Sequence, residues 1–286
     1  MKWEDGRRSS NVEDRRGMPG GRPAFVGGGL GMLVLVLLAL FLGVDPTFLL
    51  QNVPPAGEPQ QQPGPSLPAD GQADPAADFI SVVLADTEDT WTELFAEAGR
   101  QYEPPNLVLF NGSVQSACGF AQAAMGPFYC PADRKAYIDL SFYQELRDRF
   151  QAPGDFAQAY VLAHEVGHHV QNLLGLSARV QQAREQAGEA EANALSVRLE
   201  LQADCLAGVW ANRANRSRQI LETGDVEEAL TAASAIGDDR LQQQSRGYVT
   251  PDSFTHGSAE QRVRWFRRGL EGGQLESCDT FASRAL

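Results

Sequence analysis

Two histidines and a glutamate near the middle of the chain have the types and the spacing of a zinc hydrolase site. They stand in the stretch His164-Glu165-Val166-Gly167-His168. On a helix, His164 and His168 lie one turn apart on the same face, so both imidazoles can bind one zinc ion. Glu165 can then act as the base that takes a proton from a zinc-activated water. The alternative is a helix whose polar residues match a short pattern by chance.

The flanking sequence favours a helix that holds the motif at its middle. Asp155, followed by Gln158, resembles a capping box at the start of this helix, and apolar residues then recur at helical spacing up to residue 174. Gly167 lacks a side chain, which indicates close packing against another element. His169 points about 100° away from His168 around the helix, so we expect it to pack rather than to bind metal.

The third ligand is expected on a second helix. A catalytic zinc usually has three protein ligands and one water. The extended metzincin pattern is excluded, because it needs a glycine and a histidine where this chain has Gln171 and Leu174. Residues 190–213 predict a helix on which Glu200 and Asp204 share one face among apolar neighbours. Glu200 can bind the metal, whereas Asp204 can accept a hydrogen bond from a metal-binding histidine.

Two other acids and four cysteines leave alternatives open. Glu189 and Glu191 compete with Glu200 as ligands, but both lie close to Gly188, where the helix is expected to start. The cysteines predict two disulfides in an extracytoplasmic domain, and local pairing favours Cys118 with Cys130 and Cys205 with Cys278. A zinc–thiolate site is the weaker alternative, since no Cys-x-x-Cys pair is present.

The N-terminal quarter of the sequence predicts a membrane anchor and a tether. Residues 1–23 are polar and basic, residues 24–44 contain no charged residue, and residues 45–77 contain a tract rich in Pro, Gln and Gly. The uncharged run is long enough to span a membrane, and it is longer than the apolar core of a cleavable signal peptide, the competing interpretation. The excess of basic residues before this run predicts a single-pass protein with a cytoplasmic tail (1–23), an anchor (24–44), a linker (45–77) and an extracytoplasmic domain (78–286).

Residues 78–286 predict an α+β domain in which a small sheet precedes mostly helices. We expect strands at 79–84, 107–110 and 136–140, and helices at 87–102 and 142–150 before the helix with the motif. The formal net charge of the chain is −13, which argues against a nucleic-acid partner.

Together these residues resemble a known family. His164 to His168, followed by Glu200 and Asp204, looks like the gluzincin class of zinc peptidases. More closely, the chain resembles the bacterial putative neutral zinc metallopeptidase family, and the matching segments are 10–17, 126–140, 155–175, 199–210 and 254–268. The resemblance implies a zincin-like fold, with zinc bound by His164, His168 and Glu200, Glu165 as general base and Asp204 behind the ligands.

The resemblance to gluzincins suggests two further roles. His256 could donate a hydrogen bond to the oxyanion of the tetrahedral intermediate, or it could be an ordinary loop histidine. Residues 137–140 could form the sheet edge along which an extended peptide docks. Ser258 and Gln261 predict the start of a last helix, and one of its arginines (Arg262, Arg264, Arg267 or Arg268) is expected near the cleft.

The sequence therefore predicts a membrane-anchored zinc metallopeptidase that acts on peptides or proteins. A membrane-tethered binding or scaffold protein with a structural zinc is the alternative from a different class, and Glu165 argues against it, because a structural site has no use for a base there. A zinc hydrolase of non-peptide substrates would keep the same chemistry. The pattern leaves the oligomeric state open.

Overall fold

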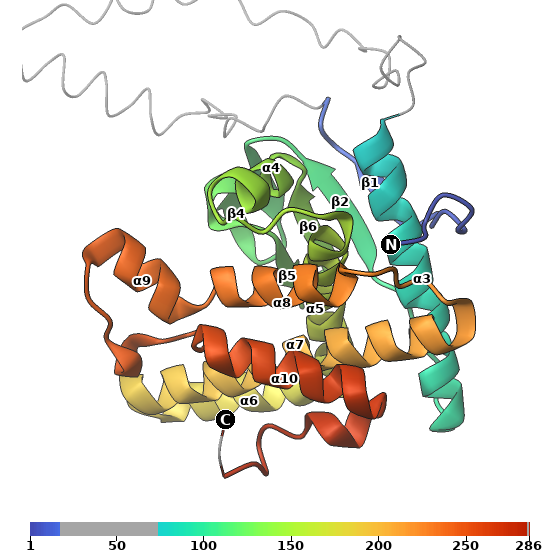
Figure 1. Ribbon diagram of the computed structural model, residues 1–286. Helices are drawn as coiled ribbons and strands as arrows, with labels where there is room; N and C mark the ends of the chain where they lie inside the picture. Colours follow the sequence, from blue (N-terminus) through green and yellow to red (C-terminus); the bar gives the residue numbers. More distant parts are fainter. Residues whose placement is uncertain (18–73, 285) are drawn as a thin grey trace, which may run out of the picture. The chain divides into compact units, whose positions relative to one another are not determined.

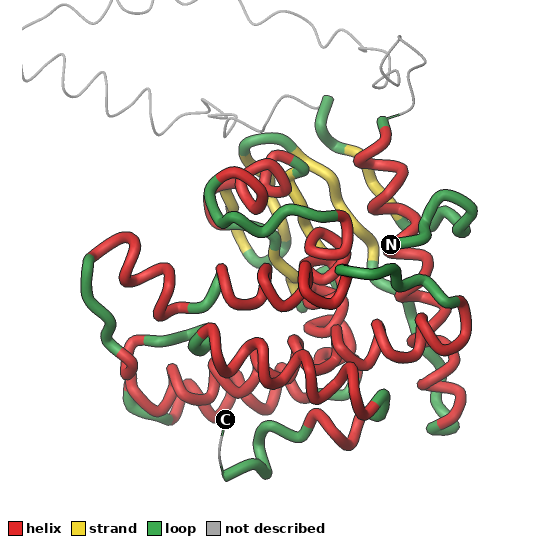
Figure 2. Tube along the Cα trace, in the orientation of Figure 1, coloured by secondary structure: helices red, strands yellow, loops and turns green. Residues whose placement is uncertain are grey.

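The computed structural model describes residues 1–17, 74–284 and 286, which form one compact unit. Along the chain the elements are β1 (Val12–Asp14), α3 (Pro75–Glu97), β2 (Asn106–Phe110), β3 (Ser113–Ser116), β4 (Gly119–Gln122), β5 (Phe128–Cys130), β6 (Lys135–Asp139), α4 (Ser141–Asp148), α5 (Asp155–Leu173), α6 (Leu176–Gln186), α7 (Glu189–Arg218), α8 (Asp225–Ala235), α9 (Asp238–Arg246) and α10 (Ala259–Gly272). Short 3-10 helices lie at Ala123–Met125, Pro251–Ser253 and Leu275–Cys278. The predicted α+β order, a small sheet and then mostly helices, is confirmed (Figures 1 and 2).

The sheet has four strands in the order β1-β2-β6-β5, and β3 pairs with β4 in a separate hairpin. Strands β1, β2 and β6 are parallel, whereas β5 runs antiparallel to β6. The predicted strands at 107–110 and 136–140 are thus confirmed as β2 and β6. The expected docking edge at 137–140 is wrong, because β6 pairs on both sides, and β5 is the edge strand instead.

Helix α3 replaces the strand and the helix that we predicted at 79–84 and 87–102. Asp74 caps it by accepting hydrogen bonds from the amides of Ala76 and Ala77, and Pro75 occupies the first turn. The β-branched run 80–83 suggested a strand, but nearly every residue from 79 to 91 is buried. A helix buried on all sides has the same continuous apolar sequence as a buried strand, so periodicity could not separate the two.

The helical layer is held together by close backbone approaches at glycines. A side chain at Gly167 of α5 would lie 2.9 Å from the carbonyl oxygen of Ala203 in α7. Gly208 of α7 and Gly269 of α10 make the same kind of approach between those two helices. The packing contact that we expected at Gly167 is thus confirmed, and it brings the motif on α5 against the acidic residues of α7. Helix α5 also packs against β5 and β6 on its other side (Figure 1).

Residues 1–17, which belong to the tail that we expected at 1–23, are folded against the rest of the described chain. Residues 12–14 form strand β1, which pairs in parallel with β2 at Leu107, Val108 and Leu109. The Glu88 carboxylate on α3, which is 6% exposed, accepts hydrogen bonds from Ser9 and Asn11. The compact unit therefore includes residues 1–17 as well as the domain that we expected to begin at residue 78. The predicted anchor at 24–44 lies outside the described residues, among which no helix is long and apolar enough to span a membrane.

Deleting the N-terminal segment should destabilise the domain. The comparison uses two chains: residues 74–286 alone, and residues 1–17 joined to residues 74–286 by a short Gly/Ser linker. We expect the free energy of unfolding of the first chain to be lower by on the order of 3 kcal/mol. The reason is that Glu88 loses the donors of Ser9 and Asn11, and a hydrogen bond to a charged group contributes about 1.5–3 kcal/mol. Urea unfolding of the two chains measures the difference, and equal midpoints would contradict it.

Candidate metal centre

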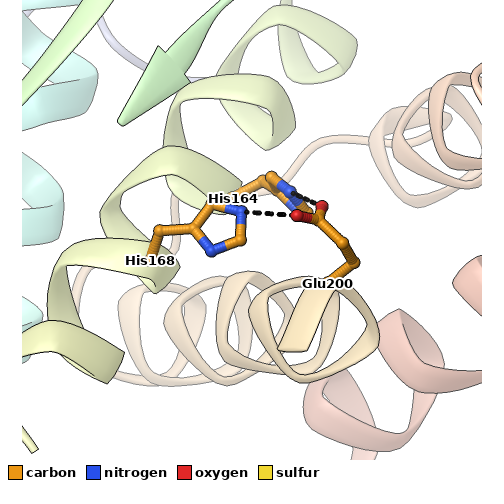
Figure 3. Close-up of side chains that lie close together, drawn as sticks. All are labelled: His164, His168 and Glu200. Carbon is orange, nitrogen blue, oxygen red and sulfur yellow. Dashed lines mark hydrogen bonds and ion pairs between the residues drawn. The ribbon is translucent and has the colours of Figure 1, made fainter. Parts of the chain in front are cut away.

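Two helices bring the predicted ligands together. His164 and His168 project from α5, and Glu200 projects from α7 toward both rings (Figure 3). His164 Nε2 lies 3.2 Å from Glu200 Oε2, and His168 Nε2 lies 3.4 Å from Glu200 Oε1. Glu189 and Glu191, the competing candidates, are exposed residues in the first turn of α7 and are not part of this group.

These donor atoms fit a zinc ion. Zinc bonds of about 2.0–2.2 Å in a tetrahedral arrangement place the ligand atoms roughly 3.3–3.5 Å apart. The distances of 3.2 and 3.4 Å from the histidines to the two Glu200 oxygens are close to that separation, and one ligand atom from each residue lies within 4.8 Å of the others. Two imidazoles and one carboxylate are also the ligand set of many catalytic zinc sites.

The Nδ1 atom of each histidine is occupied, so that Nε2 faces the ligand group. Asp204 Oδ1 lies 2.8 Å from His164 Nδ1, and Gln171 Oε1 lies 2.9 Å from His168 Nδ1. Each oxygen accepts the Nδ1 proton, which fixes the tautomer that binds metal through Nε2. Asp204 was predicted for this role. Gln171 was not, although its position three residues after His168 on one helix was a usable signal.

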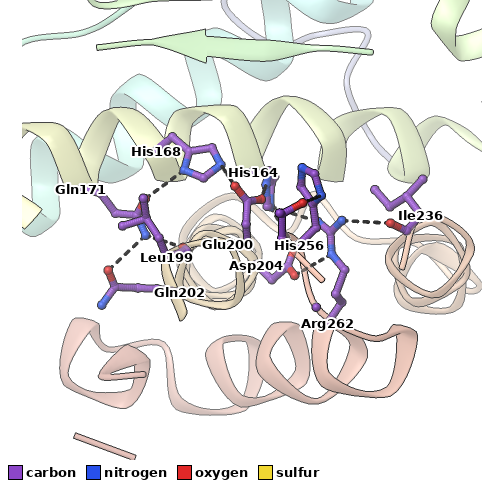
Figure 4. A network of polar contacts seen from close by, with 12 residues as sticks. His164, His168, Gln171, Leu199, Glu200, Gln202, Asp204, Ile236, His256 and Arg262 are labelled. Carbon is purple, nitrogen blue, oxygen red and sulfur yellow. Dashed lines mark hydrogen bonds and ion pairs between the residues drawn. The ribbon is translucent and has the colours of Figure 1, made fainter. Parts of the chain in front are cut away.

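Asp204 is the centre of a buried polar cluster. It is completely buried, and Arg262 of α10 donates to it through Nε and Nη2, each at 2.9 Å. Tyr160 of α5 donates its hydroxyl proton to the same carboxylate. Burial raises the pKa of Asp204, but the charges of Arg262 and His164 outweigh it and lower the pKa to about 2. The arginine expected near the cleft is thus Arg262, and it reaches the metal centre through Asp204 (Figure 4).

Gln171 is held in turn by a second chain of hydrogen bonds. Its Nε2 donates to the carbonyl oxygen of Leu199 at 2.7 Å and to Gln202 Oε1 at 3.1 Å. Gln202 then donates to the carbonyl oxygen of Cys278 at 3.0 Å. Cys278 is bonded to Cys205, and Cys118 is bonded to Cys130, so both predicted disulfides are confirmed. The zinc–thiolate alternative is excluded, because no cysteine is free.

The charges in the site depend on one another. Burial raises the pKa of Glu165, whereas the nearby histidines lower it in part, and the net shift is upward. Burial would also raise the pKa of Glu200, but the charge of His168 and hydrogen bonds from both histidines hold that pKa well below its usual value. Glu165 makes no hydrogen bond that the described residues show, although it is only 7% exposed. Its carboxylate is therefore the acid of this site that is free to exchange a proton.

His256 lies at the same centre. Figure 4 shows it near Glu200 and Arg262, whose charges also shift its pKa, and its side chain is exposed. Asp238 holds its loop, because Oδ2 accepts the backbone N–H groups of residues 255, 256 and 257. Asp238 Oδ1 lies 3.3 Å from His256 Nδ1, and this hydrogen bond raises the pKa of His256. The sequence did not indicate Asp238 as the residue that places His256.

His169 packs away from the metal centre, as expected. Its Nε2 donates to the carbonyl oxygen of Glu103 at 2.7 Å, and its Nδ1 accepts the hydroxyl proton of Tyr129 at 2.9 Å. Burial lowers the pKa of His169 to about 4, so the ring is neutral in the folded protein at pH 7. This residue joins α5 to β5 beside the motif.

His169 should make the free energy of unfolding depend on pH. The ordinary pKa of a histidine is 6.5, and that of His169 in the folded chain is about 4. At pH values between these two, His169 binds a proton in the unfolded chain but not in the folded chain. Stability from this residue is therefore complete above pH 6.5 and falls as the pH drops toward 4, by up to about 3 kcal/mol. Urea unfolding from pH 7 to 4 should show a shallower decline for His169→Gln than for wild type. His256→Gln should keep the wild-type decline in the middle of that range, because His256, whose pKa is raised, is charged there in both the folded and the unfolded chain. Parallel curves for wild type and His169→Gln would contradict the assignment.

Comparison with known proteins decides the family. The family described as putative neutral zinc metallopeptidase matches residues 1–281. The chain belongs to this family. It is 52% identical over 290 residues to the uncharacterized protein YpfJ of Escherichia coli K12, which covers 98% of this chain and 99% of that protein. It is 41% identical over 258 residues to the uncharacterized protein Rv2575 of Mycobacterium tuberculosis H37Rv, which covers 87% of this chain and 86% of that protein. No solved structure matches the chain.

Proposed function

We propose that this member of the zinc metallopeptidase family hydrolyses peptide bonds with Glu165 as general base. The observation that carries the proposal is the convergence of His164 Nε2, His168 Nε2 and the Glu200 carboxylate beside Glu165, a buried acid that makes no hydrogen bond among the described residues. Bound zinc would be held by these three residues and would supply Lewis acidity to a water and to the scissile carbonyl. A site that used zinc for folding alone would not need Glu165.

The chain's own residues would complete the reaction. Glu165 would take a proton from the attacking water and pass it to the leaving amine, a transfer that its raised pKa favours. His256, placed by Asp238, would donate a hydrogen bond to the oxyanion. Asp204 and Gln171 would keep both histidines oriented throughout.

Strand β5 supports a peptide as the substrate class. It is an edge of the four-stranded sheet, and it lies next to α5, where Tyr129 contacts His169, the neighbour of His168. An extended peptide could pair with this edge through its main chain. A zinc hydrolase of non-peptide substrates would not use that feature. The apolar run 24–44 supports attachment of the enzyme to a membrane, and the two disulfides support an extracytoplasmic location for the domain.

A peptide library tests this proposal. Full-length protein, purified in detergent and loaded with zinc, should cleave a mixed peptide library, with products identified by mass spectrometry. His168→Ala should bind less than one equivalent of zinc and cleave nothing, because it lacks one of three ligands. Wild type that holds one zinc but leaves the library intact would favour the scaffold hypothesis. Hydrolysis of ester substrates alone would favour the non-peptide alternative.

A further inference from the structure

Residues 1–17 are built into the domain by three kinds of contact. Strand β1 pairs with β2 over three residues, and the amide of Arg15 continues the pairing by donating to the carbonyl oxygen of Leu109 at 2.8 Å. Lys135 of β6 pairs with Glu13. The ring of Trp3 packs edge-on against Phe79 of α3, with 5.3 Å between ring centroids. These backbone, ionic and apolar contacts make the segment part of the core unit.

Both ends of the intervening chain lie at one place on this unit. Arg16, next to the last described residue of the segment, forms an ion pair with Asp74, the first described residue of the remainder. Asp74 also caps α3. The described residues on either side of segment 18–73 therefore lie in contact with each other.

This arrangement disagrees with the single-pass topology that the charge pattern predicted. One crossing of a membrane between residues 17 and 74 would put Arg16 and Asp74 on opposite sides, yet these residues contact each other. The uncharged run 24–44 has 21 residues, which is enough for one crossing and too short for two. We propose that residues 1–17 and 74–284 lie on the same side of the membrane.

The fold accounts for the basic residues that suggested a cytoplasmic tail. The positive-inside rule applies to basic residues that flank a span. Here each of four arginines has a carboxylate partner in the folded unit: Arg7 with Glu88 and Asp89, Arg8 with Asp78, Arg15 with Glu13, and Arg16 with Asp14 and Asp74. Three of these arginines pair with acids of α3 or its cap. Their positions are explained by the fold, without an orientation signal. The family match also begins at residue 1, so this segment is part of the family's pattern.

Thiol labelling of the full-length chain in its membrane tests the proposal. All four native cysteines are in disulfides, so Ser10→Cys and Ser245→Cys each introduce one free thiol at an exposed position. A membrane-impermeant maleimide is added to intact cells with a permeable outer envelope, and to lysed cells as the control for reactivity. We expect both variants to be labelled, or both to be protected, in intact cells. Labelling of only one of the two would overturn the proposal.

A cross-link tests the contact itself in the same membranes. The chain has two lysines, Lys2 and Lys135, and a carbodiimide should join the Lys135 amine to the Glu13 carboxylate. Lys135→Arg keeps the charge and removes the amine, so it should abolish this cross-link. Mixing isotopically light and heavy chains before the reaction distinguishes bonds within one chain from bonds between chains. Absence of the bond, or a bond only between chains, would overturn the proposal. Neither measurement depends on peptidase activity.

Discussion

Glu165→Gln should lower kcat/KM for peptide hydrolysis by about 10²–10⁴-fold while one zinc stays bound. The amide has nearly the shape of the carboxylate but cannot accept the proton of the attacking water. Glu165 is not one of the three grouped ligands, and the described residues show no hydrogen bond to it, so its replacement should leave the metal site intact. The measurement combines peptide hydrolysis with zinc content and the unfolding midpoint of the same preparation.

A matched variant separates this effect from loss of negative charge in general. Glu191 lies exposed in the first turn of α7, and Glu191→Gln makes the same chemical change away from the site. We expect Glu191→Gln to keep wild-type kcat/KM. Glu165→Gln with more than about a tenth of wild-type activity would refute the general-base role, as would a loss of activity explained by lost zinc.

Asp204→Asn should lower both the free energy of unfolding and the affinity for zinc. Arg262, which is 3% exposed, would keep its charge and lose its only carboxylate partner in the described structure. Removing one partner of a buried ion pair costs about 3–5 kcal/mol. The introduced amide would keep a single, uncharged acceptor oxygen for the donors of His164, Tyr160 and Arg262, which should weaken zinc binding by about 10–100-fold. Urea unfolding of the metal-free protein and zinc competition with a chelator measure the two effects.

A double-variant cycle identifies the source of the destabilisation. Arg262→Gln together with Asp204→Asn replaces both charges, so this pair should unfold at a higher urea concentration than Asp204→Asn alone. The zinc affinity should stay low in the double variant, because the charged carboxylate that orients His164 is still missing. Asp252→Asn, at an exposed position, is the control. If Asp204→Asn lowers the free energy of unfolding by less than about 1 kcal/mol, the buried polar cluster around Asp204 does not depend on this charge.

Local sequence was sufficient to predict those features of this protein that depend only on residues close together in the chain. The spacing of His164, Glu165 and His168 on one helix follows from helix geometry, and α5 was predicted close to its observed bounds. The capping box of Ser258 and Gln261 was predicted and is present at the start of α10. The short disulfide loop from Cys118 to Cys130 was predicted for the same reason, since it joins residues that are close in sequence.

Where a distant segment supplies the partner, local reasoning failed. The capping box expected at Asp155 and Gln158 is absent: Asp155 lies inside the first turn, and Glu228 of α8 accepts the amide of Phe156 instead. The run 79–84 looked like a strand because its burial on every side comes from elements elsewhere in the chain. The N-terminal residues looked like a charged tail, because their carboxylate partners lie mainly about 60 to 80 positions away.

The sequence by itself thus determined which side chains can lie together at a metal centre, and the tertiary structure decided how they are placed. Residue types and helical spacing predict two histidines, a base and two acids in reach of one metal, since these depend on covalent distance along a helix. Only packing decides that Gly167 lets α7 approach α5, that Arg262 neutralises Asp204, and that Gln171 orients His168. Those contacts join residues that are far apart in sequence, or they depend on the conformation of a side chain. The pattern of residue types along the chain encodes neither long-range contacts nor side-chain conformations.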